Sequence, residues 1–538
     1  MNIKQQIEKT LGHPISVSTI DICDYQCNAC FAIAKEQKVH PMQIASEMAS
    51  KFKSPLATTE AVAPGFVNFK ITDGALESAV NEILKTGKLP LEKQTPRKIF
   101  FDYGGANVAK ELHVGHLRPP IIGEALKRVF KALGHETISD THLGDWGLQI
   151  GLVLAQLEDE ENNDITLEKL NELYPKASKR KDTDTAFYNR AEQITAKLQQ
   201  SKQPYFGLWK KIISVSVPRI QENYKTLNCT FDTFEGEYKA QQYVDEILTL
   251  LKDVTYKSEN CIVMDVKTDS DTRPMPPILL RKSNGGELYS TTDVATIHYR
   301  QKEYNPDEYI YVVDFRQELH LEQVFRCVKK GNLVPPETRL VHVSYGTMNG
   351  ADGKPFKTRT GGTIKFEEVI NLITECASKR LSENGRSVDI ETAQKIGIAA
   401  LKFADLSNNV RKDYVFDIEK FTSFEGKTGP YLLYTVARIN SVLNKANNTP
   451  IPNNLTVSKT NRDVIIKTIK LADSYASAAA NYTLNGLVDA VYNLAVAFNL
   501  FYAGESIIKG GHLPLARLVK TAMLFALDTL AITVVQEM

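Results

Sequence analysis

The stretch from Lys98 to Gly147 constrains the fold more than any other part of this sequence. It begins with KIFFDYGG, a short apolar run that ends in glycines, and continues with LRPPIIGEALKRVFKALG, whose apolar residues recur at helical spacing. HETISDTHLGDWG then returns to a strand-like run and a glycine-bracketed turn. This order predicts a β-α-β unit. With NCIVMDV, EYIYVVDF and RLVHVSYG as later strands, we expect an α/β fold on an open parallel sheet.

The chain of 538 residues is long enough for about three domains. Residues 1–95 mix helical patterning with β-like runs and end in the polar stretch LPLEKQTPRK, which predicts an N-terminal α+β domain and a linker. Residues 96–370 hold the β-α-β unit and polar helix-forming insertions near 151–225, so we expect a Rossmann-like domain there. Residues 371–538 carry apolar residues at three- and four-residue spacing, which predicts an all-α helical bundle.

The charge balance is nearly neutral, with 65 Lys and Arg against 64 Asp and Glu. Nucleic-acid binding would therefore depend on a local patch rather than on overall charge. One candidate is the cluster from Lys176 to Lys181, although a solvated helix face has the same composition. Apolar runs fall short of the roughly 20 residues of a membrane span, and the opening MNIKQQIEKTLG lacks signal-peptide character. We expect a cytoplasmic protein with no membrane contact.

The seven cysteines are odd in number and mostly scattered, as is typical of reduced thiols. Cys23, Cys27 and Cys30 do cluster, and the last two have the spacing of half a zinc site. Because no complementary Cys or His pair follows nearby, we interpret the three as packed small residues and predict no bound metal.

A histidine pair lies in the segment NVAKELHVGHLR, where the first strand of the β-α-β unit passes into its helix. His113 and His116 are three residues apart, so both imidazoles can reach one ligand. Gly115 between them lets a flat base or a phosphate approach, and the unpaired amides of a helix start favour anions. The segment predicts a nucleotide site, although a His pair on a helix could also be surface decoration or an incidental metal pair.

A loop rich in glycine and cations, GTMNGADGKPFKTRTGG, follows a predicted strand. Lys354, Lys357 and Arg359 are candidates for contacting a triphosphate, because adenylyl transfer builds negative charge that cations stabilise. Composition alone is equally typical of an exposed flexible loop.

Together these motifs resemble the class I aminoacyl-tRNA synthetases, whose first signature is His-Ile-Gly-His. The longer block N-x-A-K-x-x-H-x-G-H-L-R, from Asn107 to Arg118, is similar to the arginyl enzymes in particular, as is HLGDWGLQ. Trp146 in the second block could also be a core residue. KPFKTRTGG corresponds to the second class I signature, Lys-Met-Ser-Lys-Ser, but departs from its wording. Arginyl enzymes share this departure, and the resemblance implies that Lys110 compensates for it.

The resemblance also implies an arginine pocket. A planar guanidinium calls for carboxylates placed for bidentate contact, but spacing alone does not locate them. The family's segments suggest two sets of contacts. The backbone end of arginine would be held by Asn107 and His116. The rest of arginine would be held by Glu237, Tyr289, Asp293 and Gln317.

RNA contacts are implied at both ends of the chain. The helical domain resembles the anticodon-binding domain of the arginyl enzymes, where Tyr431 and Tyr434 could stack on bases, although tyrosines on an amphipathic helix are often core residues. The N-terminal domain is similar to the family's added domain that touches the tRNA corner.

The resemblance implies an arginine–tRNA ligase that forms arginyl-adenylate from L-arginine and ATP with Mg²⁺ and then charges tRNA(Arg), with tRNA needed for activation. We expect a monomer. Catalysis would come from positioning and charge stabilisation by His113, His116, Lys110, Lys357 and Arg359, with Gly115 and Lys354 also at the ATP. Two alternatives are a small-molecule adenylylating ligase, which has no use for RNA-binding domains, and a catalytically silent RNA-binding paralogue, which should have lost the histidines.

Overall fold

The structure is a computed structural model that describes residues 2–18, 22–92, 94–160, 164–283, 288–350, 353–354, 364–383, 385, 389–446 and 450–538. Its centre is a four-stranded parallel sheet in the order β11-β10-β5-β6. The strands are β5 (Lys98–Asp102), β6 (Glu136–Asp140), β10 (Glu308–Asp314) and β11 (Arg339–Tyr345). Helix α5 (Arg118–Ala132) connects β5 to β6, so the predicted β-α-β unit is present.

The strand order reverses at β5, which has β6 on one side and β10 on the other. Ligands of open α/β sheets bind outside the carboxyl ends of the strands at such a point. Of the later strand candidates, EYIYVVDF and RLVHVSYG form β10 and β11. The placement of NCIVMDV in this sheet was wrong. It forms β8 (Cys261–Met264) of a separate antiparallel sheet with β7 (Tyr256–Ser258) and β9 (Ile278–Arg281).

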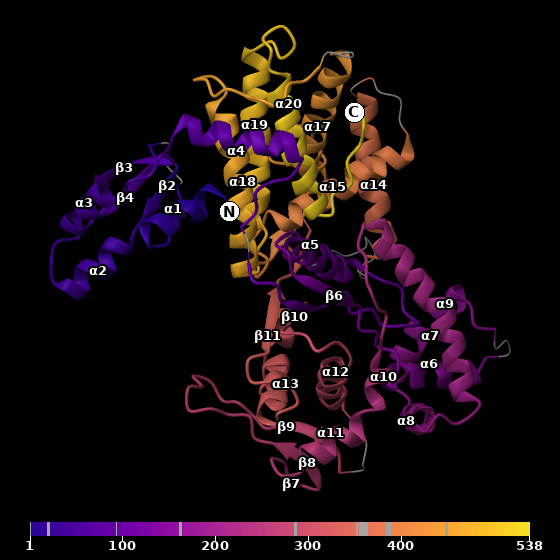
Figure 1. Cartoon of the computed structure of the whole chain (residues 1–538). Helices are drawn as coiled ribbons and strands as arrows, with labels where there is room; N and C mark the ends of the chain where they lie inside the picture. The colour runs from indigo at the N-terminus through magenta and orange to yellow at the C-terminus, as the bar shows by residue number, and fades with distance from the viewer. Residues whose placement is uncertain are drawn as a thin grey trace.

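Helices surround the sheet and fill the insertion (Figure 1). The insertion holds α6 (Leu148–Glu158), α7 (Leu167–Arg180), α8 (Thr185–Gln199) and α9 (Tyr205–Thr226). Further along lie α10 (Glu237–Gln241), α11 (Val244–Leu250), α12 (Tyr289–Tyr304) and α13 (Glu318–Lys330). Two of the four cations of the basic cluster at Lys176–Lys181 are ion-paired: Lys176 contacts Glu172, and Arg180 contacts Asp159. These pairs favour its interpretation as a solvated helix face.

The C-terminal part is helical, as predicted. It contains α14 (Phe366–Glu383), α15 (Ile390–Leu406), α16 (Ile418–Phe421), α17 (Gly429–Lys445), α18 (Arg462–Asn481), α19 (Asn485–Gly504) and α20 (Leu513–Thr529). A short parallel pair, β12 (Met348–Asn349) with β13 (Tyr414–Val415), joins it to the sheet domain. Among the described residues, α19 is long and apolar enough to cross a membrane, contrary to our reading of the apolar runs. Eight of its residues, Val491 and Phe498 among them, are buried in the bundle, whereas Leu500 is exposed.

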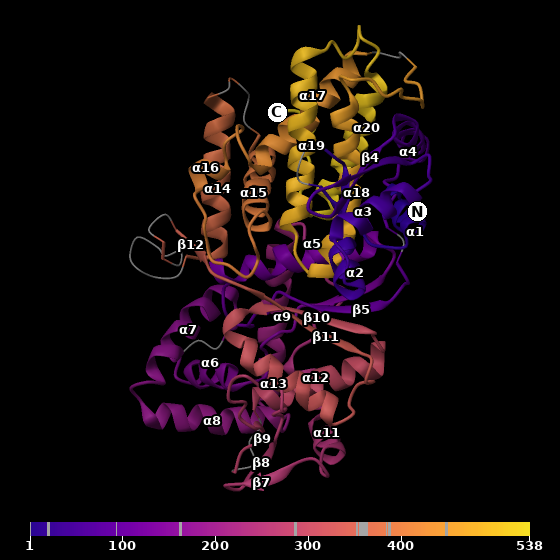
Figure 2. The same cartoon turned by 90° about the vertical axis from the view of Figure 1, so that its left-hand side faces the viewer.

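The N-terminal domain packs beside α18 (Figures 1 and 2). It has α1 (Ile3–Leu11), β1 (Ser16–Val17), β2 (Tyr25–Cys27), α2 (Ala29–Gln37), α3 (Pro41–Lys51), β3 (Ala57–Val62), β4 (Phe66–Ile71) and α4 (Asp73–Thr86), with an antiparallel sheet in the order β1-β2-β4-β3. Cys23, Cys27 and Cys30 are buried free thiols. Asp473 of α18 accepts hydrogen bonds from Asn2 Nδ2 at 2.9 Å and from the Tyr25 hydroxyl at 2.6 Å.

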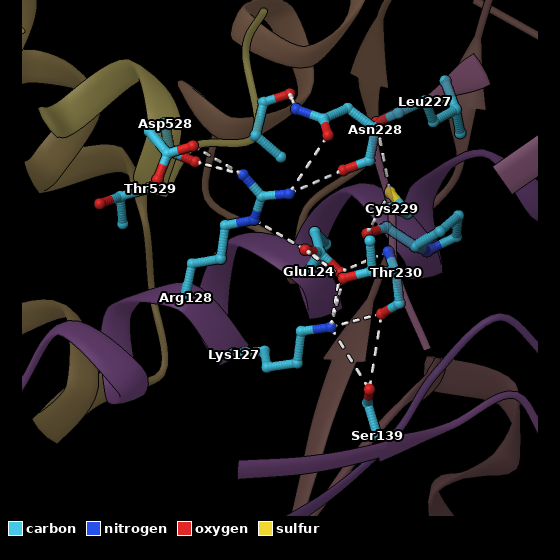
Figure 3. A network of polar contacts seen from close by, with 12 residues as sticks. Glu124, Lys127, Arg128, Ser139, Leu227, Asn228, Cys229, Thr230, Asp528 and Thr529 are labelled. Carbon is cyan, nitrogen blue, oxygen red and sulfur yellow. Dashed lines mark hydrogen bonds and ion pairs between the residues drawn. The ribbon is translucent and has the colours of Figure 1, made fainter. Parts of the chain in front are cut away.

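A polar junction connects the sheet domain to the end of the helical bundle (Figure 3). Arg128 of α5 donates to the backbone carbonyls of Asn228 at 3.0 Å and Asp528 at 2.8 Å. Nearby, the buried ammonium of Lys402 donates to the carbonyls of Leu227 and Ala531. Each of these two charged side chains therefore connects backbone carbonyls of two segments that lie far apart in the sequence.

Candidate active site

A cavity of about 450 Å³ opens at the carboxyl ends of β5, β10 and β11, next to the reversal of strand order. The histidine segment lines one side of it, and the residues that follow β11 line another. Its walls include His113, Gly115, His116, Asp314, Thr347 and Met348.

The two histidines cap the short helix η1 (Val114–His116) in a reciprocal arrangement. His113 Nδ1 accepts from the Gly115 N–H at 3.1 Å, and the His113 N–H donates to His116 Nδ1 at 3.1 Å. The ring centroids are 4.0 Å apart. The backbone therefore fixes both rings side by side, as the spacing predicted. A side chain at position 115 would crowd the pair, because a Cβ on Gly115 would lie 2.9 Å from His113 Cε1.

Burial keeps both imidazoles neutral. It lowers the pKa of His113 to about 4, with Lys110 adding to the effect, and the pKa of His116 to about 3, with His113 and Lys110 contributing. Burial also lowers the pKa of Lys110, whose Nζ is 3.5 Å from His113 Nε2. Since both Nδ1 atoms accept backbone N–H groups, the neutral rings carry their protons on Nε2. The site thus presents donors, which suit an anion such as a phosphate.

The loop that carries Lys110 is held by the insertion. Ala109 has φ of 62°, a strained conformation for a residue with a side chain, and its N–H donates to the buried Ser216 Oγ of α9 at 3.1 Å. Lys110 Nζ lies 5.7 Å from the ring centroid of Tyr174 on α7. The position of Lys110 therefore depends on two helices of the insertion.

The basic loop begins and ends beside the histidines, although Lys357 and Arg359 lie outside the described residues. Thr347 and Met348, just before the loop, line the cavity. Just after it, the Ile364 carbonyl accepts from the Val114 N–H at 3.1 Å, and Lys365 is bridged to His113. The backbone carbonyl of Lys354 accepts from the Gly350 N–H at 2.8 Å. Both ends of the loop are thus anchored at the nucleotide site that the sequence predicted.

The residues expected to contact arginine gather around α12. The Tyr289 hydroxyl donates to Gln317 Oε1. Burial, together with the nearby charge of Asp293, raises the pKa of Glu237 to about 7. Asp293 lies one helical turn from Tyr289, and the charges of Asp293 and Glu237 both act on the Tyr289 hydroxyl. These four side chains therefore form one cluster, the acidic pocket, in which Glu237 and Tyr289 line a cavity. Arg300, also on α12 and fully buried, donates to Asp102 and Asp140 at 2.6 Å each and ties the helix to the ends of β5 and β6.

Asn107 lies next to the turn that follows β6. It is bridged to Gly144, and a Cβ on Gly144 would lie 2.0 Å from Asn107 Oδ1. Trp146 in the same turn is 2 % exposed and packs against Trp209 at 5.0 Å, so it is a core residue. The structure therefore places Asn107 against Gly144 and explains why this position holds a glycine.

Two residues of the pocket were missed from the sequence. Asp145 is buried, accepts from the Tyr238 N–H at 3.1 Å, and has its pKa raised by burial to about 7. His320 Nε2 is 2.6 Å from Asp293 Oδ2. The sequence does contain a signal for each residue: Asp145 lies in the HLGDWG turn, and His320 follows Gln317 by about one helical turn.

The tyrosines proposed for RNA contact differ in exposure. The Tyr431 hydroxyl accepts from Asn499 Nδ2 at 2.9 Å, and its ring is 5.5 Å from that of Tyr492, so it is partly a packing residue. Tyr434 is 38 % exposed, and the guanidinium of Arg438 lies 4.7 Å from its ring centroid. Tyr434 is the more accessible of the two.

The fold and site define a class of protein that the comparisons bear out. Residues 79–418 match the model "tRNA synthetases class I (R), catalytic domain". Residues 2–71 match "Arginyl tRNA synthetase N terminal domain", and residues 432–538 match "DALR anticodon binding domain". The molecule is therefore a class I aminoacyl-tRNA synthetase.

Similar proteins identify the family within this class. The arginine–tRNA ligase of Alkaliphilus oremlandii is 42 % identical over 521 residues, which cover 91 % of this chain and 88 % of that protein. The arginine–tRNA ligase of Francisella tularensis is 33 % identical over the full length of both chains. Two solved arginyl-tRNA synthetase structures share its fold. The one from Plasmodium falciparum has a TM-score of 0.84 and 23 % identity, and the match covers 100 % of this chain and 98 % of that chain. The one from Thermus thermophilus has a TM-score of 0.81 and 22 % identity, with the same coverage of both chains. The chain belongs to the arginyl-tRNA synthetase family.

Proposed function

We propose that this chain joins L-arginine to tRNA(Arg) at the expense of ATP. The observation that carries the proposal is a connection between two unlike sites through α12, the helix of Tyr289 and Asp293: its Arg300 donates to Asp102, which lines the cavity of the histidine pair. One is a donor-only site made by His113, His116 and Lys110; the other is a pocket with Glu237 and Asp293. The first suits a triphosphate and the second suits a guanidinium. The printed names of the relatives supply arginine and tRNA as the substrates.

The reaction follows from this arrangement. The arginine carboxylate attacks the α-phosphorus of ATP, supplied as its Mg²⁺ complex, and pyrophosphate leaves. The terminal adenosine hydroxyl of the tRNA then takes the arginyl group, and AMP is released. His113, His116 and Lys110 stabilise charge on the phosphates, with Lys357, Arg359 and Lys354 contributing from the basic loop and Gly115 giving close approach. Glu237, Tyr289, Asp293 and Gln317 hold the side chain of arginine, while Asn107 and His116 hold its backbone end.

The RNA contacts are assigned to the helical and N-terminal domains. We place the domain boundaries at residues 1–95, 96–370 and 371–538, with Tyr434 and Tyr431 at the anticodon. The exposed ring of Tyr434 beside Arg438 supports stacking on a base. The enzyme is proposed to act as a cytoplasmic monomer and to require tRNA for activation.

Charging and pyrophosphate exchange with a panel of amino acids, with and without tRNA, test this function. We expect arginine to be the preferred amino acid and exchange to depend on tRNA. Loading of another amino acid would overturn the proposed substrate, and full exchange without tRNA would overturn the tRNA requirement. Exchange with no transfer to any tRNA would instead favour the small-molecule ligase.

A further inference from the structure

Two helical segments face each other across the acidic pocket, each with a pair of side chains about one turn apart. Tyr289 and Asp293 belong to α12. Gln317 ends the short helix η2 (Phe315–Gln317), and His320 lies in the first turn of α13. Gln317 accepts from the Tyr289 hydroxyl, so one residue of each pair is already joined across the pocket.

His320 joins the other two corners. Its Nε2 is 2.6 Å from Asp293 Oδ2, and its ring stacks on that of Tyr289 with centroids 4.0 Å apart and planes at 17°. The imidazole therefore touches both α12 residues at once. Its side chain is 17 % exposed, and that of Asp293 is 23 % exposed. This pair is close enough to the surface of the pocket to meet a ligand, yet largely enclosed by protein.

The bond to His320 leaves half of the Asp293 carboxylate available. A carboxylate has two oxygens, and the imidazole N–H occupies only Oδ2. Within the described part of the chain, Asp293 Oδ1 accepts no hydrogen bond. An Asp side chain with one oxygen held keeps a single rotamer, so the second oxygen faces a cation in a fixed direction. Preorganisation of this kind lowers the cost of binding.

We propose that His320 is a positioning residue for arginine recognition, which fixes Asp293 and the Tyr289 ring before the guanidinium arrives. This rests on the proposed function, since it assigns a role within the arginine pocket. His320 acts through Asp293 and Tyr289 and does not itself contact the reacting atoms.

Two substitutions distinguish the hydrogen bond from simple packing. In His320→Gln the amide nitrogen can occupy nearly the place of Nε2 and can still donate to Asp293. In His320→Asn the amide is too short to reach that oxygen, although the residue stays polar. His320→Leu removes the donor altogether. His298→Leu is a matched control. His298 lies on α12, as Asp293 does, and its Nε2 is 3.0 Å from a different carboxylate, that of Glu246, outside this pocket.

Steady-state pyrophosphate exchange with saturating tRNA provides the measurement, with KM determined separately for arginine and ATP. We expect His320→Leu and His320→Asn to raise the KM for arginine roughly 10- to 100-fold, the range expected for loss of a hydrogen bond to a charged group. The KM for ATP should stay within about 3-fold of wild type, and His320→Gln and His298→Leu should be close to wild type for both substrates. If His320→Leu does not fold, the comparison of His320→Gln with His320→Asn still tests whether hydrogen-bond donation to Asp293 matters.

An unchanged KM for arginine in the Asn variant would overturn the positioning role. Parallel rises in both KM values would also overturn it, because they would indicate a general structural role. Equal effects of Gln and Asn would show that donation to Asp293 is not what matters. Failure of the wild-type protein to activate arginine would instead count against the proposed function.

Discussion

Single carboxyl groups set the chemical character of the acidic pocket that we propose for arginine. Burial raises the pKa of both Glu237 and Asp145 to about 7, with Asp293 also acting on Glu237. Without a bound cation these carboxyl groups are therefore about half protonated at neutral pH, and a guanidinium would favour their ionised forms. The sequence predicts the histidine pair well because its geometry is local. Asp145 and His320 could not be predicted, because only the folded chain brings them to residues from other elements.

Arginine binding should depend on pH through Glu237. Because the pKa of Glu237 is raised in the free enzyme and a bound cation lowers it, arginine binding releases a proton below about pH 7. The KM for arginine should therefore rise as pH falls from 8 to 6, by up to roughly 10-fold per pH unit. Exchange kinetics across this range measure it. Glu237→Gln should have a weaker pH dependence and a higher KM throughout, and an equally steep dependence in that variant would exclude Glu237 as the titrating group.

A second prediction concerns Gly144. In Gly144→Ala the new Cβ would clash with Asn107 Oδ1, so Asn107 must move. We expect kcat/KM for arginine to fall by on the order of 100-fold, since a displacement of about 1 Å has effects of this size. Gly486→Ala is the control, because a Cβ there has no neighbour within 4 Å. Wild-type kinetics in Gly144→Ala would show that Asn107 has no role in binding.

At the scale of elements, the insertion acts as a support for the nucleotide site. Helices α7 and α9 hold the strained loop at Ala109 and the side chain of Lys110. The sequence predicts the helices but not this role, because the partners are 60 or more positions apart in the chain. Asn171 of α7, for example, donates to Glu111 at a separation of 60. The same limit explains β8. Its apolar run predicts a strand, yet nothing local specifies the sheet to which it belongs.

The aromatic face of Tyr174 should matter for ATP use. Tyr174→Leu removes the ring beside Lys110 and should lower kcat/KM for ATP about 3- to 10-fold, whereas Tyr174→Phe keeps the ring and should match wild type. Initial rates of exchange at varied ATP measure both. Equal behaviour of the two variants would mean that the ring does not position Lys110.

At the scale of the whole molecule, the N-terminal domain docks on α18 through a titratable group. Burial raises the pKa of Asp473 to about 7 from an unfolded value of 3.8. The folded state therefore binds this proton more tightly, and the associated stability is present at low pH and lost as pH rises through about 7. Such contacts between distant segments have no local sequence signal, although changes in composition and hydrophobic periodicity along the sequence do predict separate domains.

Asp473→Asn tests this interface. The amide can still pair with Tyr25 and Asn2, but it does not titrate. The variant should gain stability relative to wild type between pH 5 and pH 8, by up to about 3 kcal/mol, because each pH unit between 5 and 7 corresponds to about 1.4 kcal/mol. Thermal melting of both proteins at the two pH values provides the comparison. A difference in Tm that does not change with pH would rule out Asp473 as the source.

The junction at Lys402 has a consequence for how the chain is made. Burial lowers the pKa of Lys402, and its ammonium is satisfied by carbonyls of Leu227 and Ala531. Asn228, next to Leu227, also pairs with Ala531, at a separation of 303 residues. The ribosome must therefore finish nearly all of the bundle before this ammonium gains its second acceptor. A nascent chain that stops short of Ala531 lacks one of the two carbonyl acceptors of Lys402, so we expect it to be less stable than the full chain.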